Sequence, residues 1–500
     1  MPIRLSGLAS GLDTENIVSE LMSAQRLKAT KIENKKTKLE WKKEKWQDLN
    51  KKLYSFYTGS LNNMKMQGSF NTKSATTSNP NKVAVTAGNS AVEGSHQIKV
   101  SQLASAQFVT GAKLGSDVNA STTLSSLGVG TGDITITNGA KSKTLTVDGT
   151  TKVSDLVSAM TEAGLNASFD NVQKRLYLSS KGSGTDSSFS MSAASGVDLS
   201  KVGLSSFQST NSDGSVALSG GGSMAFVAAK NATFEYNGSS MTSSTNSIAV
   251  NGLTFNLLAT TGSETVSINV KKDTEAVYEK IKGFVKEYNG LIAQMNEFYH
   301  AGTAKGFEPL TDEEKESMTE DQIEKWETKI KDSLLRRDNT LSTLLGTMRS
   351  EMSRSTTYNG KSYSLASFGV VTADYTEKGL LHINGDKDDS TVSSLKNDLM
   401  KALNENPEAV METFTKLAGN LYTSFTDSMK SNSLRSALTF YNDKEMKKQI
   451  DDYKEDLSTL EDKLADIENR YYKQFTAMEK AMSNMNAKSN SLASMLGTGS

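Results

Sequence analysis

Both ends of this chain are long segments without proline in which apolar residues recur at heptad spacing. The four prolines lie at positions 2, 80, 309 and 407, so residues 3–79 and 408–500 contain no helix breaker. Apolar residues spaced alternately three and four apart are typical of helices that pair along one face. We therefore predict a coiled-coil stalk in which the two ends of the chain pair. Its apolar stripe comprises Ile32, Leu39, Trp46, Leu53, Ile450, Leu457, Leu464 and Tyr471.

Charge favours the same pairing. Residues 26–52 contain 11 Lys or Arg against 4 Asp or Glu, whereas residues 443–480 contain 8 against 11. Opposite charges on two helices favour their association. A lysine-rich helix can also bind nucleic acid, but these lysines interleave with a core stripe, and an acidic partner lies in the same chain. We therefore expect a solvated face matched to a partner helix, and no binding of nucleic acid.

Residues 70–270 differ from both ends in composition and in pattern. They contain 24 charged residues in 201 positions, whereas 23% of the whole chain is charged. Apolar and polar residues alternate along several segments, as in half-buried strands. The clearest examples are Ile134 and Ile136, Leu253, Phe255 and Leu257, and Val266, Ile268 and Val270. Asn251-Gly252 stands between two such segments, where a hairpin turn is expected, so the middle is predicted to be β-rich.

Helical periodicity returns at Asp273 and continues in several segments to the C-terminal end. The chain is therefore expected to be an α+β multidomain protein, in which terminal helices form a coiled-coil stalk and a helical bundle, with nested β-rich domains inserted between the bundle helices. The predicted domains are a terminal coiled-coil leg of 1–40 and 470–500, a helical bundle of 41–71 and 273–469, a β-rich head of 72–104 and 215–272, and an inserted β-rich variable domain of 105–214.

Residue patterns for catalysis or metal binding are absent from the sequence. The chain contains no cysteine, and its three histidines lie far apart, at His96, His300 and His382. Asp386, Asp388 and Asp389 lack the later ligands of a calcium loop and indicate a solvated turn. No segment has a nucleophile with a matching base. We therefore predict neither an enzyme nor a cofactor.

Targeting and membrane segments are also not expected. Residues 1–25 have no uninterrupted apolar stretch of the kind found in a cleaved secretory signal. No window approaches the roughly 20 apolar residues that cross a bilayer. The net charge of −1 gives no overall attraction to an anionic surface. We therefore expect no membrane insertion.

Several motifs together resemble a known family. The opening Leu5-Ser-Gly-Leu-Ala-Ser-Gly-Leu-Asp-Thr-Glu-Asn-Ile-Val-Ser-Glu-Leu-Met22 closely resembles the start of the flagellar hook-associated protein 2 family, the filament-capping proteins. The tail from Arg470 to Met482, with the Asn- and Ser-rich segment after it, resembles the end of that family. Leu145–Met191 is similar to the hook-associated insertion motif, and residues 246–257 and 285–292 are similar to the family's C-terminal domain.

This resemblance implies a fold and a function. Members leave the bacterium unfolded through the flagellar type III export apparatus and act outside the cell, at the distal tip of the filament. There they form a ring-like cap, commonly a pentamer, which helps flagellin fold and insert, so that the filament elongates and the cell is motile. The partners implied are further copies of the same chain, flagellin, the hook–filament junction protein and a flagellar export chaperone.

The family's termini form legs that contact the filament. The outer turns, roughly 1–40 and 470–500, are expected to be unpaired within one chain until another subunit or the filament covers them. The methionines near the C-terminal end are either core filling or a surface that adapts to a changing partner. The predicted leg residues are Leu5, Leu8, Leu12, Ile17, Leu21, Met478, Met485 and Leu492.

Other functions stay open at this point. Another flagellar axial component, such as a hook–filament junction protein, would share helical ends and a β-rich middle. A tip adhesin would use the β-rich domains for cell adhesion by binding host glycans or mucin, and this is compatible with capping. The charged stretch 305–335 is longer than the family's minimal pattern, so the resemblance implies no role for it.

Overall fold

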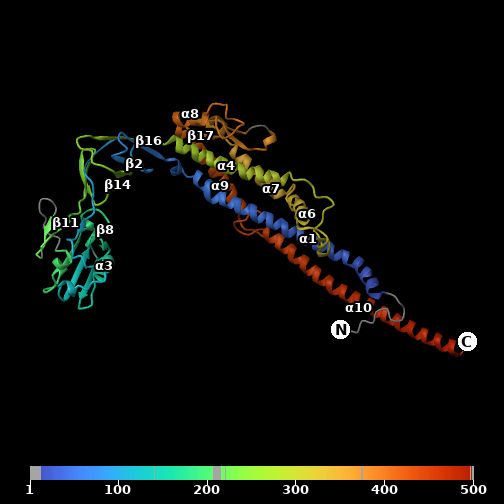
Figure 1. The fold of residues 1–500 in the computed structure, drawn as a ribbon. Helices are drawn as coiled ribbons and strands as arrows, with labels where there is room; N and C mark the ends of the chain where they lie inside the picture. Colours follow the sequence, from blue (N-terminus) through green and yellow to red (C-terminus); the bar gives the residue numbers. More distant parts are fainter. Residues whose placement is uncertain are drawn as a thin grey trace. The chain divides into compact units, whose positions relative to one another are not determined.

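The computed structural model of this protein describes residues 13–139, 141–205, 215–219, 221–372, 375–495 and 497. They form two compact units. The helical unit combines the two ends of the chain, up to Phe70 and from Thr274 onward, and the β unit is Asn71–Asp273 (Figure 1). The predicted α+β multidomain class is confirmed, whereas the finer division into four domains stays a prediction.

Two long helices form the stalk of the helical unit. α1 (Thr14–Phe56) begins at Asp13, whose carboxylate accepts a hydrogen bond from the backbone N–H of Asn16, and α10 is Asp443–Met495. At 1.5 Å per residue, their 43 and 53 residues extend roughly 65 and 80 Å. They run side by side and antiparallel, because Val18 packs near Leu464 whereas Trp46 stacks on Tyr441 (Figure 1). α1 continues through a π-helical turn, η1 (Tyr57–Leu61), into α2 (Asn62–Met64).

The remaining helices pack beside the inner parts of this pair. They are α4 (Thr274–Tyr299), α5 (Asp312–Glu316), α6 (Glu320–Ser333), α7 (Asn339–Met352), α8 (Asp398–Glu405) and α9 (Pro407–Ser428). Two small hairpins accompany them, β17 (Thr356–Tyr358) with β18 (Lys361–Tyr363), and β19 (Val370–Thr372) with β20 (Leu381–Ile383). One large core holds α4, α7, α8, α9 and the hairpins together with the inner part of α1, and its largest buried side chains include Trp46, Phe284, Tyr288, Phe414, Phe425 and Phe440.

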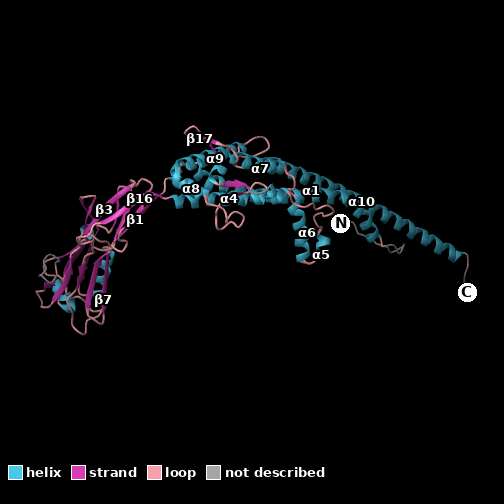
Figure 2. Ribbon diagram, turned by 90° about the horizontal axis from the view of Figure 1, so that it is seen from above, coloured by secondary structure: helices cyan, strands magenta, loops and turns pink. Residues whose placement is uncertain are grey.

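The β unit is built mainly of strands (Figure 2). These strands surround two separate apolar clusters. Around the first lie two sheets, with the strand orders β1-β16-β3-β12-β13 and β14-β15-β2. Their bounds are β1 (Lys73–Thr77), β2 (Val83–Ala87), β3 (Gly94–Gln102), β12 (Ala232–Tyr236), β13 (Ser239–Ser243), β14 (Ser247–Val250), β15 (Leu253–Leu257) and β16 (Val266–Lys272). Asn251 and Gly252 both have positive φ in the turn between β14 and β15, as the sequence predicts for this hairpin.

The second cluster lies between α3 and two further antiparallel sheets, ordered β10-β11-β4-β8-β7 and β6-β5-β9. Alternation places Ile134 and Ile136 of β5 inside this cluster. The bounds are α3 (Val153–Glu162), β4 (Phe108–Thr110), β5 (Gly132–Asn138), β6 (Lys141–Val147), β7 (Leu165–Asp170), β8 (Arg175–Ser180), β9 (Phe189–Ala193), β10 (Ser215–Ala217) and β11 (Ser223–Val227). Across the described residues, every helix is too short or too polar to serve as a membrane span.

Candidate functional site

The predicted coiled-coil stripe lies largely along the contact between α1 and α10. Trp46 and Leu53 of α1 are fully buried, and α10 buries Ile450, Leu457 and Leu464. The other three residues of the stripe are half-buried, namely Ile32, Leu39 and Tyr471. Trp46 and Leu53 belong to the main core, whereas Leu464 and Tyr471 lie in a small cluster with Val18 and Met22, so the pairing of the two halves of the stripe with each other stays a prediction. Whether the same residues also pair with further copies of the chain stays a prediction.

The inner end of the stalk is fixed to the core. The Trp46 ring stacks on Tyr441, with ring centroids 5.6 Å apart. The Asn50 amide donates to the Leu438 carbonyl at 3.3 Å, and its oxygen accepts from the Phe440 backbone N–H at 2.8 Å. Through these two bonds the Asn50 side chain satisfies backbone groups of the loop that leads into α10. These contacts join this end of the stalk to the core.

The outer end of α1 is paired as well, in a way that the sequence did not indicate. Val18 and Met22 are buried against Leu464, in a small cluster edged by Leu460, Ile467, Tyr471, Tyr472 and Phe475. The predicted leg residues Ile17 and Leu21 lie one position away, Ile17 half-buried and Leu21 41% exposed. The prediction that the outer turns are unpaired within one chain is therefore wrong for this part of α1.

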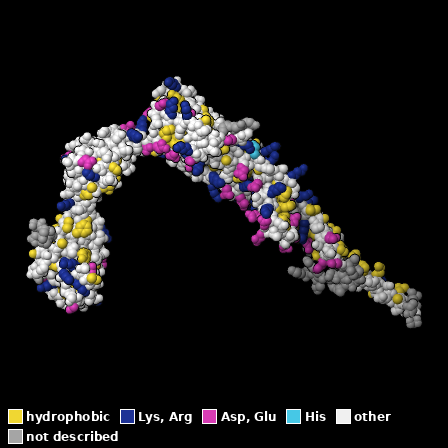
Figure 3. Space-filling model, turned by 45° about the horizontal axis from the view of Figure 1, so that its top comes forward, with side chains coloured by type: hydrophobic (Ala, Val, Ile, Leu, Met, Phe, Trp, Pro, Cys, Tyr) yellow, Lys and Arg dark blue, Asp and Glu magenta, His cyan; other side chains and the backbone are white. Residues whose placement is uncertain are grey.

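The outer part of α10 is exposed, by contrast. Met478, Met485 and Leu492 are 37%, 69% and 58% exposed, and hydrophobic side chains are visible on the surface toward this end of the stalk (Figure 3). Leu5, Leu8 and Leu12 lie outside the described residues. An apolar stripe of this kind on a long helix is typical of a surface that another chain covers. These three side chains are thus available to a partner in the isolated chain.

The basic face of α1 pairs with the charged insertion between α4 and α7. Lys38 contacts Glu308 at 2.6 Å, Lys45 contacts Asp332 at 2.8 Å, and Lys42 contacts Asp338 at 2.7 Å. From α1 to α10, the ion pair described is Arg26 to Glu468, at 3.8 Å. Three of the eleven basic residues in 26–52 thus pair with the insertion and one pairs with α10, so the prediction that opposite charge joins the two terminal helices is supported by one described ion pair and otherwise stays a prediction.

The insertion is itself folded against α1. The Trp326 indole of α6 donates to the Glu308 carbonyl at 2.8 Å and packs on Phe307, with ring centroids 4.4 Å apart. Lys331 lies 4.6 Å from the centre of the Trp41 ring. Burial raises the pKa of Glu327, but hydrogen bonds from Lys331 and Lys315 outweigh it and lower the pKa below its usual value. The insertion is thus a brace on the middle of the stalk.

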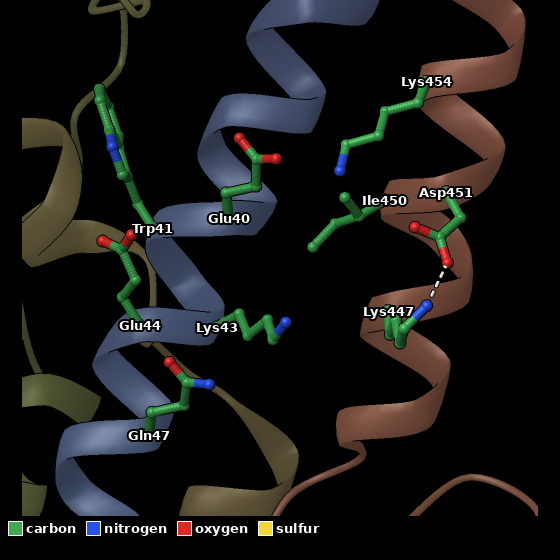
Figure 4. Close-up of a pocket in the computed structure, with 9 residues that line it drawn as sticks. All are labelled: Glu40, Trp41, Lys43, Glu44, Gln47, Lys447, Ile450, Asp451 and Lys454. Carbon is green, nitrogen blue, oxygen red and sulfur yellow. Dashed lines mark hydrogen bonds and ion pairs between the residues drawn. The ribbon is translucent and has the colours of Figure 1, made fainter.

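A polar cleft of about 510 Å³ separates α1 from α10 beside this brace (Figure 4). Ile450 is its one aliphatic residue, and Trp41 points away from α10. A hydrogen bond from Lys447, at 2.6 Å, lowers the pKa of Asp451. Most of the residues that line the cleft are charged, so it is a polar gap in the seam. Its lining residues are Glu40, Trp41, Lys43, Glu44, Gln47, Lys447, Ile450, Asp451 and Lys454.

A second ionic cluster was not predicted. The His382 ring lies between Glu377 and Asp389, at 2.5 and 2.6 Å, and Lys282 of α4 contacts both Asp386 and Asp388 at 2.6 Å. Burial opposes the imidazolium, but hydrogen bonds to the two carboxylates raise the pKa of His382. The interpretation of Asp386 as part of a solvated turn is wrong, because its side chain is buried. Within the described ranges no three His, Asp or Glu side chains are placed to share a metal ion.

Comparisons with known proteins agree on one family. A family model of the flagellar hook-associated protein 2 C-terminus matches residues 229–487, and the N-terminus model matches residues 10–107. The flagellar hook-associated protein 2 of Halalkalibacterium halodurans is 27% identical over 98% of this chain and 99% of its own length. That of Escherichia coli K12 is 28% identical, over 97% of this chain and 96% of its own.

A solved structure shows the same fold. The crystal structure of the D1-D2-D3 domains of the flagellar cap protein FliD from Escherichia coli matches with a TM-score of 0.51 and 21% identity. It covers 82% of this chain and 99% of the other. The C-terminus model alone matches more than half of the chain, and the N-terminus model accounts for the opposite end. The chain therefore belongs to the flagellar hook-associated protein 2 family.

Proposed function

We propose that this protein is the structural cap at the distal tip of the bacterial flagellar filament, where it promotes the folding and insertion of exported flagellin. The main support is the family match at both ends of the chain. The same ends form a stalk, and the outer part of α10 exposes an apolar stripe. A related protein that shares the fold is described as a flagellar cap protein. The proposed action needs binding surfaces and no covalent chemistry.

The leg is the part that would hold the cap on the filament. Met478, Met485 and Leu492 follow one another at seven-residue spacing and are exposed in the single chain. Full burial of a Met or Leu side chain contributes about 1.5–3 kcal/mol, so a partner helix along this stripe would gain several kcal/mol. Their placement favours the adaptable-surface interpretation of the methionines over core filling. The predicted role of Leu5, Leu8 and Leu12 in the same leg remains part of this proposal.

The assembly that follows is a ring of identical chains, most simply a pentamer as in the family. In each chain of this ring, the β unit would contain two domains. The head would comprise 72–104 and 215–272, and the inserted variable domain would comprise 105–214. The proposed partners are flagellin below the ring, the hook–filament junction protein before the filament grows, and an export chaperone inside the cell. The site of action is extracellular. The glycan-binding alternative has no support from the described residues or from the comparisons.

Complementation tests this function. Cells that lack the chain should release flagellin as monomer into the medium and swim poorly, because filaments cannot elongate. The full chain should restore filaments, whereas a chain without residues 485–500 should fold and yet fail to restore them. A normal circular dichroism spectrum of the truncated chain is the control for its fold. Normal filaments in cells that lack the chain would contradict the capping function, and normal filaments with the truncated chain would contradict the leg.

A further inference from the structure

The lysines of α1 continue beyond the brace. Six of them recur at alternating spacings of three and four, at positions 28, 31, 35, 38, 42 and 45, so they share one face of the helix. The inner three pair with the brace, as described above. The outer three, Lys28, Lys31 and Lys35, are exposed, and no described acidic group forms an ion pair with them. We call these outer three residues the lysine stripe.

An acidic surface lies on the brace. Residues 312–324, which span α5 and the start of α6, contain seven Asp or Glu against one Lys, and all seven acidic side chains are exposed. Two of these are used locally, since Glu314 caps α5 at Thr311 and Asp321 pairs with Lys325 of the same helix. The other five form no ion pair with a described residue. They are Asp312, Glu313, Glu316, Glu320 and Glu324.

The two surfaces do not meet within one chain. Contacts between the brace and residues 38–45 of α1 hold it in place, while Trp326 and Phe307 fix its internal packing. Lys28 lies ten residues, or roughly 15 Å, further along the helix than Lys38. One copy therefore carries a basic face and an acidic face that form no described ion pair with each other. A second copy carries the complement of each.

We propose that in the assembled cap the acidic surface 312–324 of one copy lies against the lysine stripe of the next copy. This inference rests on the proposed ring. A contact between two different surfaces of identical chains repeats around a ring when its rotation closes. It would extend the chemistry seen inside each chain, where acidic groups of the brace already pair with lysines of the same α1 face. Complementary charge at such rims speeds association and selects the partner.

Charge reversal on the full-length chain tests the contact. Sedimentation velocity should show that Lys28→Glu, Lys31→Glu and Lys35→Glu together weaken self-association at least tenfold. The triple variant Glu313→Lys, Glu316→Lys and Glu320→Lys should do the same. Mixing the two variants should restore association, because the reversed charges are complementary again. Lys51→Glu, Lys430→Glu and Lys447→Glu together are the control, since each of these exposed lysines pairs with an acidic residue three or four positions away and its reversal should leave association unchanged.

Each outcome decides the proposal. Reversed variants that associate like the wild type, or a mixture that does not recover, would overturn the contact and leave the capping function standing. A wild type that stays monomeric at every concentration would overturn the ring and the contact together. If the lysine variant loses binding to monomeric flagellin but still self-associates, the stripe binds flagellin instead. Should a variant lose its helical circular dichroism, the salt dependence of the wild type decides, because association that is insensitive to salt would overturn the contact.

Discussion

Leu464 of α10 lies buried beside Val18 and Met22 of α1, in a cluster separate from the main core of the helical unit. Replacing Leu464 with Asp places a carboxylate where apolar side chains meet. Because the cluster is small and near the outer part of the stalk, separation of the outer helices can return the charge to water without unfolding the core. We therefore predict that Leu464→Asp opens the outer stalk and leaves the rest of the helical unit folded.

The size of the effect follows from the burial. A buried Leu contributes up to about 3 kcal/mol relative to an exposed one, and a stranded carboxylate costs more still. Opening of the stalk returns the carboxylate to water, so the cost of a stranded charge arises only in the closed state. The lost burial of Leu464 therefore sets the minimum change in the free energy of opening. A change of about 3 kcal/mol raises the ratio of open to closed stalk about a hundredfold.

Amide hydrogen exchange on the full chain measures this ratio region by region. Peptides from 14–29 and 457–475 should exchange about a hundredfold faster in the variant, whereas peptides around Trp46 and Phe414 should not change. Leu492→Asp is the matched control, because Leu492 is 58% exposed and its replacement should leave all rates alone. Faster exchange throughout the helical unit would show that stalk and core unfold together, and unchanged exchange would show that the Leu464 cluster does not hold the stalk closed.

Three further predictions concern stability. Asp338 caps α7 by accepting hydrogen bonds from the N–H groups of Thr340 and Leu341, and it also pairs with Lys42. Asp338→Ala should therefore lower the free energy of unfolding by about 1–2 kcal/mol in urea titrations. The control is Asp321→Ala, which removes an exposed ion pair and should change this free energy by less than about 0.5 kcal/mol. The pKa of His382 is raised in the folded state, so the contribution of the protonated ring to stability is complete below the ordinary value of 6.5 and is lost as pH rises through the folded pKa. His382→Gln should remove this loss of stability at higher pH. A variant with the same dependence of stability on pH as the wild type would contradict the role of the His382 contacts. A fragment of Asn71–Asp273 should fold alone, because it has its own apolar clusters, and a random-coil circular dichroism spectrum would refute this.

Heptad spacing was enough to predict the stalk, but it did not predict which face of α1 packs on α10 at the outer end. Trp46 and Ile450 each have polar residues on both sides in the sequence, so only one helical face can be buried there. At the outer end the apolar residues come in adjacent pairs, Ile17-Val18 and Leu21-Met22, which fit two faces about 100° apart. Packing on Leu464 selects the second face, and that contact is not visible from local sequence.

Charge was a weaker guide than apolar pattern. The surplus of basic residues in 26–52 is real, but net charge does not say which neighbour a given face meets. Lys38, Lys42 and Lys45 lie on a face that meets the brace, and the brace could be predicted only as helices with capping boxes. The ionic cluster at Asp386 also escaped prediction, because Lys282 lies over a hundred residues earlier in the chain.

The location of the protein on the filament tests the capping function most directly. An antibody against the β unit, labelled with gold, can be applied to intact filaments and viewed by electron microscopy, with cells that lack the chain as the control for background. The proposed function predicts label at the distal end of each filament and at no other position along it. Label along the filament shaft, or confined to the junction with the hook, would contradict a cap and would indicate a different axial component.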